Sequence, residues 1–251
     1  MTCVRDPFPS TLTQVVFLAG HGEPADRRRA QNETCRRYWL PLNVYARRRG
    51  YSADAANDLT QGFLAQLVAN DELARVDLAR RTFRPWLRRC FSNYIANVRA
   101  HGGAIYVGGA AVHVPYDSAE AERYQSLTST APSPDEAFEQ TRALLVVHRA
   151  FAALRAEWLR KGQGRRFDAL AEFVTFEDER RYRALAAELG ESEVGVRKAV
   201  ERLRGEHREF LFREAARYSE RAEDLDSELE YLLGLLANSP GAPLGSTQEA
   251  V

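Results

Sequence analysis

The residue types that most often carry out catalysis or bind metals are few and scattered in this sequence. Its five histidines lie at positions 21, 101, 113, 148 and 207, and its three cysteines lie at positions 3, 35 and 90. No HExxH motif and no Cys/His cluster with the spacing of metal ligands is present, so we expect no metal site. The cysteines have no evident histidine partner, and GxSxG and P-loop motifs are absent.

One pair of carboxylates has a spacing that acid/base catalysis could use. Asp54 and Asp58 lie at i and i+4 on one face of a predicted helix over residues 53–69. They lack the apolar surroundings that would shift the pKa of either carboxyl group. We therefore predict that the protein is not an enzyme and requires no cofactor.

Composition excludes several other classes of protein. The 251 residues suffice for one domain or two modest ones, and a hydrophobic share of 45% is too high for a disordered chain. The net charge is zero, with 35 basic and 35 acidic residues, which argues against a histone-like coat on nucleic acid. Three widely spaced cysteines favour a reducing cytosol. We expect no signal peptide and no membrane span, because no long apolar run is present.

The charges are nevertheless segregated along the chain. Residues 27–50 hold eight arginines against one acid, and residues 80–100 hold six arginines and no acid. Residues 116–140 and the tail from 219 are predominantly acidic. Such asymmetry suggests contact with a polyanion at the basic segments, although solvated helix faces would give the same pattern.

Helical spacing of apolar residues predicts an almost entirely α-helical chain. Ser52 is a suitable N-cap for the helix over 53–69, and Pro85 is tolerated in the first turn of the next helix. The stretch 117–134, which ends in SLTSTAPSP, is typical of a polar linker. The predicted helices cover residues 25–49, 53–69, 83–99, 135–160, 167–173, 182–189, a long segment from about 193, and 225–236.

Residues 182–203 fit a helix-turn-helix. Ala186 is a small residue where the two helices approach, and Gly190 supplies the turn. A second helix of this kind fits the major groove of DNA and presents its first residues to base edges. The apolar seam is formed by Leu185, Leu189, Val196, Val200 and Leu203, and the residues offered to DNA are Ser192, Glu193, Arg197, Lys198, Glu201, Arg202 and Arg204.

Two further segments resemble parts of bacterial sigma factors. Residues 45–68 are similar to their core-polymerase-binding segment, through Asp54, Ala55, Asp58, Leu59, Gln61 and Phe63 or Leu64. Residues 83–103 resemble the promoter-melting segment of the extracytoplasmic-function (ECF) group, through Phe83, Arg84, Trp86, Leu87, Arg89, Asn93 and Asn97. The helix-turn-helix resembles the −35-binding domain of the same family, and the three segments occur in the family order.

The resemblance implies an all-α fold of two small helical domains. A region 2-like bundle would occupy residues 1–100 and a region 4-like helix-turn-helix domain residues 135–217. A flexible, Gly-rich and acidic linker over 101–134 would join them. An acidic extension over 218–251, a helix followed by a disordered tail, goes beyond the minimal plan; it could pack on the −35 domain, bind a partner or mask the recognition helix.

The resemblance also implies a function: a cytoplasmic sigma factor that directs core RNA polymerase to promoters, melts the −10 element and recognises the −35 element. Contacts with the β′ clamp helices of polymerase are implied for Asp54, Asn57, Asp58, Leu59, Gln61 and Phe63. Contacts with −10 DNA are implied for Arg84, Trp86, Arg88, Arg89, Asn93 and Asn97, although core packing is favoured over base stacking for Trp86.

Two departures from the family pattern keep other interpretations open. Ala199 stands where an extra basic residue is frequent, and the acidic Glu201 lies on the exposed face of the recognition helix. The alternatives are a stand-alone helix-turn-helix regulator that binds duplex DNA, and a sigma-like interaction protein without promoter activity. Candidate regulators are an anti-sigma factor or a kinase, and the kinase would act on Ser126, Thr128, Ser129, Thr130 or Ser133.

Overall fold

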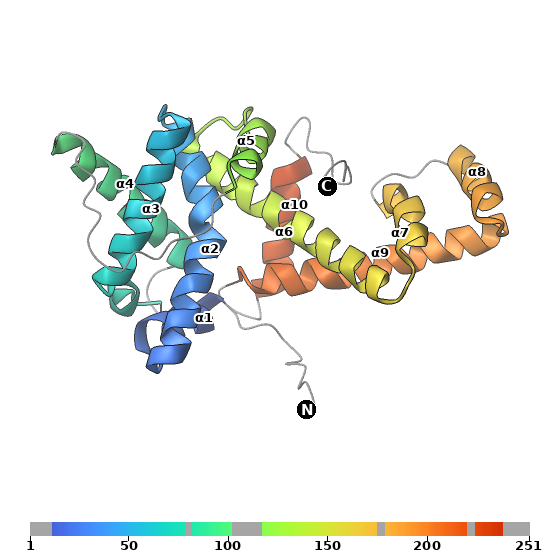
Figure 1. The fold of residues 1–251 in the computed structure, drawn as a ribbon, viewed down its shortest axis with the longest axis horizontal. Helices are drawn as coiled ribbons and strands as arrows, with labels where there is room; N and C mark the ends of the chain where they lie inside the picture. Colours follow the sequence, from blue (N-terminus) through green and yellow to red (C-terminus); the bar gives the residue numbers. More distant parts are fainter. Residues whose placement is uncertain (1–11, 79–81, 102–116, 175–178, 220–223, 238–251) are drawn as a thin grey trace. The chain divides into compact units, whose positions relative to one another are not determined.

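The structure, a computed structural model, describes residues 12–78, 82–101, 117–174, 179–219 and 224–237. Within these ranges every regular element is a helix, which confirms the predicted all-α fold (Figure 1). The Gly-rich arm expected at 102–116 and the tail expected from 238 lie outside the described residues. The α-helices are α1 (Leu12–His21), α2 (Pro24–Arg48), α3 (Ala53–Ala69), α4 (Phe83–Ala100), α5 (Ser118–Leu127), α6 (Pro134–Arg160), α7 (Gly164–Ala171), α8 (Glu179–Leu189), α9 (Glu193–Ala216) and α10 (Leu225–Ala237), with short 3₁₀ helices at η1 (Glu72–Arg75) and η2 (Glu172–Val174).

Local sequence signals explain where several helices begin. The Ser52 hydroxyl accepts a hydrogen bond from the Ala55 N–H at 3.2 Å, so α3 starts at the predicted residue. Asp117 caps α5 in the same way, through the N–H groups of Ala119 and Glu120. Gly190 has a φ of +65°, the left-handed conformation that the predicted turn between α8 and α9 requires.

Contacts group the chain into two compact units, the first of which includes the described residues from 12 to 143 and from 216 to 237. Within this unit α2 packs against α1, α3 and α5. The buried Tyr38 of α2 contacts the rings of Phe83, Phe138 and Tyr218 at centroid distances of 5.4, 6.3 and 6.4 Å. These ring contacts bring α4, the start of α6 and the segment after α9 onto α2.

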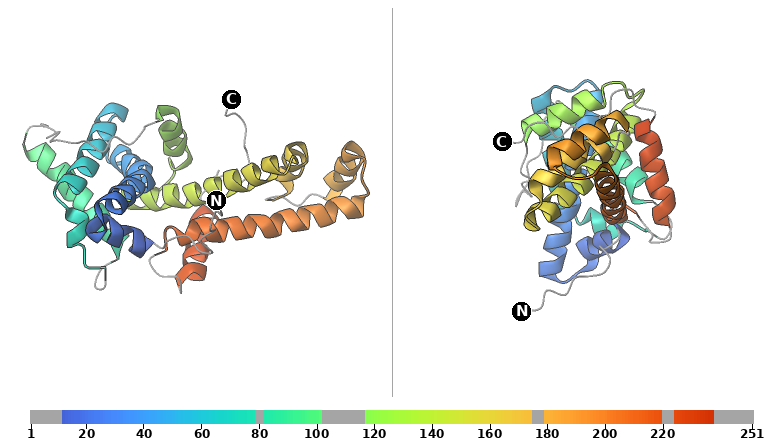
Figure 2. Two further views of the ribbon diagram at one scale, coloured as in Figure 1. Left: turned by 60° about the horizontal axis from the view of Figure 1, so that its bottom comes forward. Right: turned by 90° about the vertical axis from the view of Figure 1, so that its right-hand side faces the viewer.

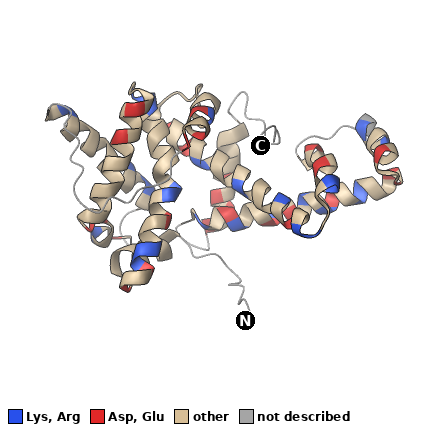
Figure 3. Ribbon diagram, viewed as in Figure 1, with Lys and Arg blue, Asp and Glu red and all other residues tan. Residues whose placement is uncertain are grey.

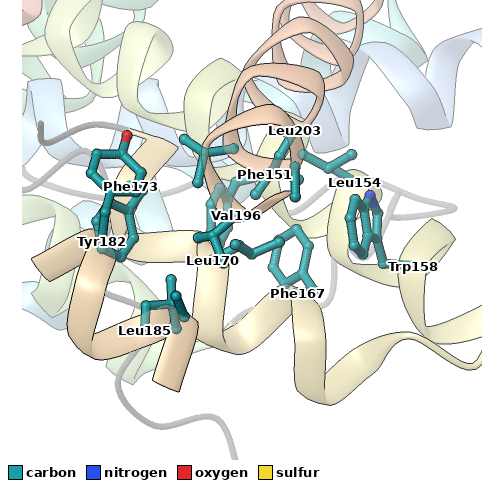
Figure 4. Packing of buried hydrophobic residues seen from close by; sticks show 13 residues of the cluster. Phe151, Leu154, Trp158, Phe167, Leu170, Phe173, Tyr182, Leu185, Val196 and Leu203 are labelled. Atoms are coloured by element: carbon teal, nitrogen blue, oxygen red, sulfur yellow. The ribbon is translucent and has the colours of Figure 1, made fainter. Parts of the chain in front are cut away.

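The described residues of the second unit lie between 144 and 215 and have a hydrophobic core of their own (Figure 4). The Phe167 ring of α7 meets the rings of Phe151 and Trp158 of α6 at 5.3 and 5.9 Å. Phe173 meets Tyr182 of α8 at 4.8 Å. Figures 1 and 2 show α8 beside the N-terminal part of α9, as a helix-turn-helix requires. From α9 the core receives Val196, Ala199, Val200 and Leu203.

These units differ from the predicted domains in three places. The division falls inside α6, after Ala143, rather than at residue 134. The segment 117–134, predicted as a flexible linker, contains α5 with Tyr124 buried, because Asp117 caps the helix and Arg47 pairs with Glu122 at 3.2 Å. The helix predicted as a C-terminal extension, α10, belongs to the first unit.

Candidate nucleic-acid interface

α4 has one buried face and one exposed face. Its buried residues are Phe83, Leu87, Phe91, Tyr94 and Ile95, which recur at helical spacing. On the opposite face Arg89, Asn93 and Asn97 are exposed at i, i+4 and i+8. Three of the six residues predicted to contact −10 DNA therefore form one exposed row, which combines a cation with two amide side chains.

Two other predicted DNA contacts on α4 are engaged within the protein. Arg84 donates to both carboxylate oxygens of Glu228, at 2.8 and 3.0 Å. Arg88 pairs with Asp135 at 3.1 Å and lies over the Phe138 ring. Their side chains lie on the flank of α4 that faces α6 and α10, so in this structure neither is presented to DNA as predicted.

Trp86 lies between the two environments considered for it. The side chain is half-buried, and its ring lies 5.5 Å from that of Phe83. The ring is therefore not fully packed in the core, and its role in base stacking stays a prediction.

A buried cluster of charges that sequence reasoning missed surrounds Arg142. This residue has no exposed surface; it donates to Glu139 at 3.0 Å and also pairs with Glu228. Burial lowers the pKa of Arg142, but Glu139 and Glu228 outweigh it and leave the pKa raised. Burial likewise opposes ionisation of Glu228, while Arg142 and Arg84 bring its pKa below the usual value. The only sequence signal was a Glu139–Arg142 pair at i and i+3 beside an apolar run.

The ion pairs of this cluster hold the acidic C-terminal helix α10 against the rest of the first unit. Glu228 projects from α10 onto Arg84 of α4 and Arg142 of α6. α10 carries acidic segments in Figure 3, and its Glu228 carboxylate pairs with two arginines of the first unit, Arg84 and Arg142. The sequence left open packing on the −35 domain, binding a partner or masking the recognition helix. It did not predict the contact between α10 and α4.

α3 presents acids on its surface and buries apolar residues that were predicted to bind polymerase. Asp54 and Asp58 are exposed, whereas Asn57 and Gln61 are half-buried. Leu59 and Phe63 are only 3% and 4% exposed. The Phe63 ring contacts those of Phe91 and Tyr94, at 5.0 and 5.7 Å. Leu59 and Phe63 therefore anchor α3 in the first unit, and a partner cannot reach them as predicted.

The first turn of α9 is fixed by local contacts. The Ser192 hydroxyl accepts from the Gly195 N–H at 3.1 Å and caps the helix. Arg197 pairs with Glu193 at 3.0 Å and lies over the Tyr182 ring at 4.6 Å. Three predicted DNA contacts, Ser192, Glu193 and Arg197, thus also stabilise the turn between the helices.

Further along α9 the predicted contacts divide into exposed and internal ones. Lys198, Glu201 and Arg202 are exposed. Arg204 is half-buried and donates to the Phe173 carbonyl at 3.0 Å, so it supports the core rather than facing DNA as predicted. Ala199 is 5% exposed and belongs to the core. Ala199 therefore contributes to the core and offers no charge to DNA.

One exposed residue at the start of α9 was not predicted. Val194 is 63% exposed, in the first turn of the helix. It lies one turn before the exposed Lys198 on the same face. The signal in the sequence was its position four residues before Lys198, outside the apolar seam of the helix.

The candidate phosphorylation sites have different environments. Thr128 is buried, and its hydroxyl donates to the Tyr124 carbonyl at 2.8 Å, so a kinase cannot reach it in this fold. The hydroxyl of Ser133 accepts from the Glu136 N–H at the start of α6. Ser126, Ser129 and Thr130 are exposed.

The described cysteines and histidines show no catalytic arrangement. Burial raises the pKa of the Cys35 thiol to about 12, which suppresses the reactive thiolate. Burial lowers the pKa of His207, whose ring packs against that of Phe151. The part of the chain that the structure describes holds no group of three or more His, Cys, Asp or Glu placed to bind a metal ion. Within the same residues, no helix combines the length and apolarity that crossing a membrane requires.

Comparison of this chain with protein-family models, with curated proteins and with solved structures gives no match. The resemblance to sigma factors therefore depends on the residues themselves. Their placement in exposed rows or in the core decides which of them can act on a partner.

We predict that Glu228→Ala destabilises the protein by about 3 kcal/mol, because it leaves Glu139 as the remaining carboxylate beside both the buried Arg142 and Arg84. Urea unfolding would measure the loss. Glu230→Ala is the matched control, since Glu230 is exposed on the same helix, and it should change stability by less than about 0.5 kcal/mol. Equal effects of the two substitutions would contradict the prediction.

The same pair of variants should differ in their dependence on pH. The folded-state pKa of Glu228 is lowered, so its contribution is present above the unfolded pKa and is lost as pH falls through the folded value. The stability gap between wild type and Glu228→Ala should therefore narrow in acid. Urea unfolding of both proteins at several acidic pH values would measure this difference in free energy. A difference that stays constant with pH would contradict the prediction.

Proposed function

We propose that this protein is a sigma factor of the ECF type, which binds core RNA polymerase in the cytoplasm and directs it to promoters. The observation that carries the proposal is the second unit, where a capped helix packs one side into a helix-turn-helix core and exposes Lys198, Glu201 and Arg202 on the other. This division of faces is what docking in a major groove requires. Polymerase itself would supply the catalysis.

In this proposal α3 provides the contact with polymerase. Asp54 and Asp58 are both exposed, one turn apart. Carboxylates in this arrangement suit a basic helical surface such as the β′ clamp helices. Leu59 and Phe63 contribute by holding α3 in place.

α4 would hold the separated non-template strand of the −10 element. Arg89 offers a cation to phosphate, while the amides of Asn93 and Asn97 can both donate to and accept from an unstacked base. All three are exposed in one row of the helix. Arg84 and Arg88 would position α4 through their carboxylate partners.

α9 would read the −35 duplex. Lys198 can bind guanine, Glu201 can accept from the amino group of cytosine, and the apolar Val194 suits the methyl group of thymine. Arg202 is exposed and can reach a phosphate. An anti-sigma factor, or a kinase acting at Ser126, Ser129 or Thr130, remains the class of regulator that we propose.

We expect Asp54→Asn combined with Asp58→Asn to weaken binding to bacterial core polymerase by about tenfold or more, because two exposed carboxylates are removed without disturbing the core. Size-exclusion chromatography and a binding titration with purified core enzyme would measure this. Gln66→Ala, an exposed position on the same helix, is the control and should bind as wild type does.

A wild-type protein that fails to bind competent core enzyme would overturn the proposed function. Stable dimers that bind a palindromic duplex tightly without polymerase would instead identify a stand-alone regulator.

Lys198→Ala should weaken −35 recognition by about 1–3 kcal/mol because Lys198 reads a base, whereas Arg202→Ala should weaken binding to every promoter about equally because Arg202 contacts a phosphate. Promoters selected from a random library by the polymerase complex would provide the templates, and run-off transcription the readout. Arg165→Ala removes an exposed arginine from α7 in the same unit and should leave transcription unchanged. Unchanged promoter use by both α9 variants would count against this recognition surface.

A further inference from the structure

Near the middle of α9 lies a glycine that neither close packing nor backbone conformation requires. Gly205 is exposed, and a Cβ atom at this position would meet no atom within 4 Å. Its φ is not in the left-handed range. Glycine in the interior of a helix is less stable than alanine, because it loses more conformational entropy on folding. Nothing in the described residues therefore compensates for the absence of a side chain here.

Gly205 interrupts an exposed ridge of side chains. Val194, Lys198, Glu201, Gly205 and Arg208 follow one another at helical spacing and are all exposed. The ridge lies opposite the buried seam of the same helix. At Gly205 the helix backbone is bare, so a neighbouring molecule can approach more closely there than elsewhere on the ridge.

Two cations flank this bare position. Arg202 and Arg208 are exposed, three residues before and three after Gly205. The Glu206 carboxylate lies 3.9 Å from Arg202, and the Arg208 guanidinium lies over the Phe212 ring at 5.6 Å. The nearby exposed acid Glu209 pairs with Arg213 at 3.5 Å. The exposed Glu201 also lies one turn before Gly205, so the attraction for a polyanion comes from the individual arginines Arg202 and Arg208 and not from a net positive charge.

Helix geometry indicates which part of a duplex would lie at this point. An α-helix rises about 1.5 Å per residue, so Gly205 lies about 16 Å along the axis from Val194. The major groove is only about 12 Å wide. A helix that places Val194 and Lys198 at base edges therefore reaches the bordering sugar-phosphate strand near Arg202 to Arg208.

We propose that a phosphate strand of duplex DNA crosses α9 at Gly205, with Arg202 and Arg208 neutralising the phosphates on either side. The backbone N–H of Gly205 is hydrogen-bonded within the helix and cannot donate to a phosphate. Gly205 therefore contributes only by having no side chain, which lets the strand approach the helix. The inference rests on the proposed function and adds a phosphate-contact site to it. A contact of this kind sets the register of the protein on DNA without reading sequence.

The test is a substitution that should improve stability and impair binding. Gly205→Ala should raise Tm by about 2 °C, because alanine favours the helix. It should also weaken binding to a mixed-sequence DNA duplex by about three- to tenfold, since the added methyl group holds the strand away. Gly234→Ala is the matched control: Gly234 is exposed in α10, and its Cβ would also meet nothing within 4 Å. It should raise Tm similarly without changing DNA binding.

Fluorescence anisotropy at several salt concentrations would measure binding, for the full chain alone and with core polymerase. Arg202→Ala and Arg208→Ala should each reduce the slope of log affinity against log salt by about 1. If Gly205→Ala binds DNA as tightly as wild type, or lowers Tm, the proposal that a phosphate strand crosses at Gly205 is wrong, while the proposed function stands. If the wild-type protein binds neither duplex DNA nor polymerase, both the proposed function and the phosphate contact at Gly205 are wrong.

Discussion

A guanidinium with no exposed surface is costly to bury unless carboxylates lie against it, and Arg142 is in this position. Glu139 provides one carboxylate from α6 itself, and Glu228 provides the other from α10, 86 positions away in the chain. The buried charge of Arg142 therefore holds Glu228 of α10 in place, together with the burial of Leu229, Leu232 and Leu236 on the same helix. Because Glu228 also accepts both hydrogen bonds from Arg84, the same carboxylate orients α4.

The orientation of α4 decides which of its polar residues a partner can meet. With Arg84 and Arg88 turned toward Glu228 and Asp135, the exposed row is Arg89, Asn93 and Asn97. The arginines of α4 thus divide into Arg84 and Arg88, which hold the fold, and Arg89 and Arg99, which are exposed. Because half of these four arginines are engaged within the protein, the proposed role of α4 depends on the two amides as much as on charge.

The sequence predicted those features that follow from local signals. Ser52 begins α3, Gly190 makes the turn, and the seam from Val196 to Leu203 is buried, because capping, backbone conformation and helical periodicity act over a few residues. α5 was missed because its Ser- and Thr-rich flank resembles a linker, whereas its burial depends on α2.

The site residues that were wrongly placed share a different cause. Leu59 and Phe63 were assigned to a partner although their helical spacing equally indicates a core, and the structure places them in the core. Arg84 and Arg88 were assigned to DNA because their partners lie far away in the chain, where no periodicity in α4 could reveal them. Long-range pairing of charges is therefore the part of this interface that the sequence alone could not provide.

One side of α9 packs in the core of the second unit, and in the proposed function the other side binds DNA. Ala199 belongs to the core, and Arg197 is held between Glu193 and the Tyr182 ring, so neither adds free charge to the outer face. Lys and Arg alternate with acids along this helix in Figure 3, and the net charge of the whole chain is zero.

Non-specific attraction to DNA grows with the number of phosphates that basic residues neutralise. With few such residues exposed on α9, discrimination between promoters would depend on the individual contacts of Val194, Lys198 and Glu201, and polymerase would have to supply much of the affinity.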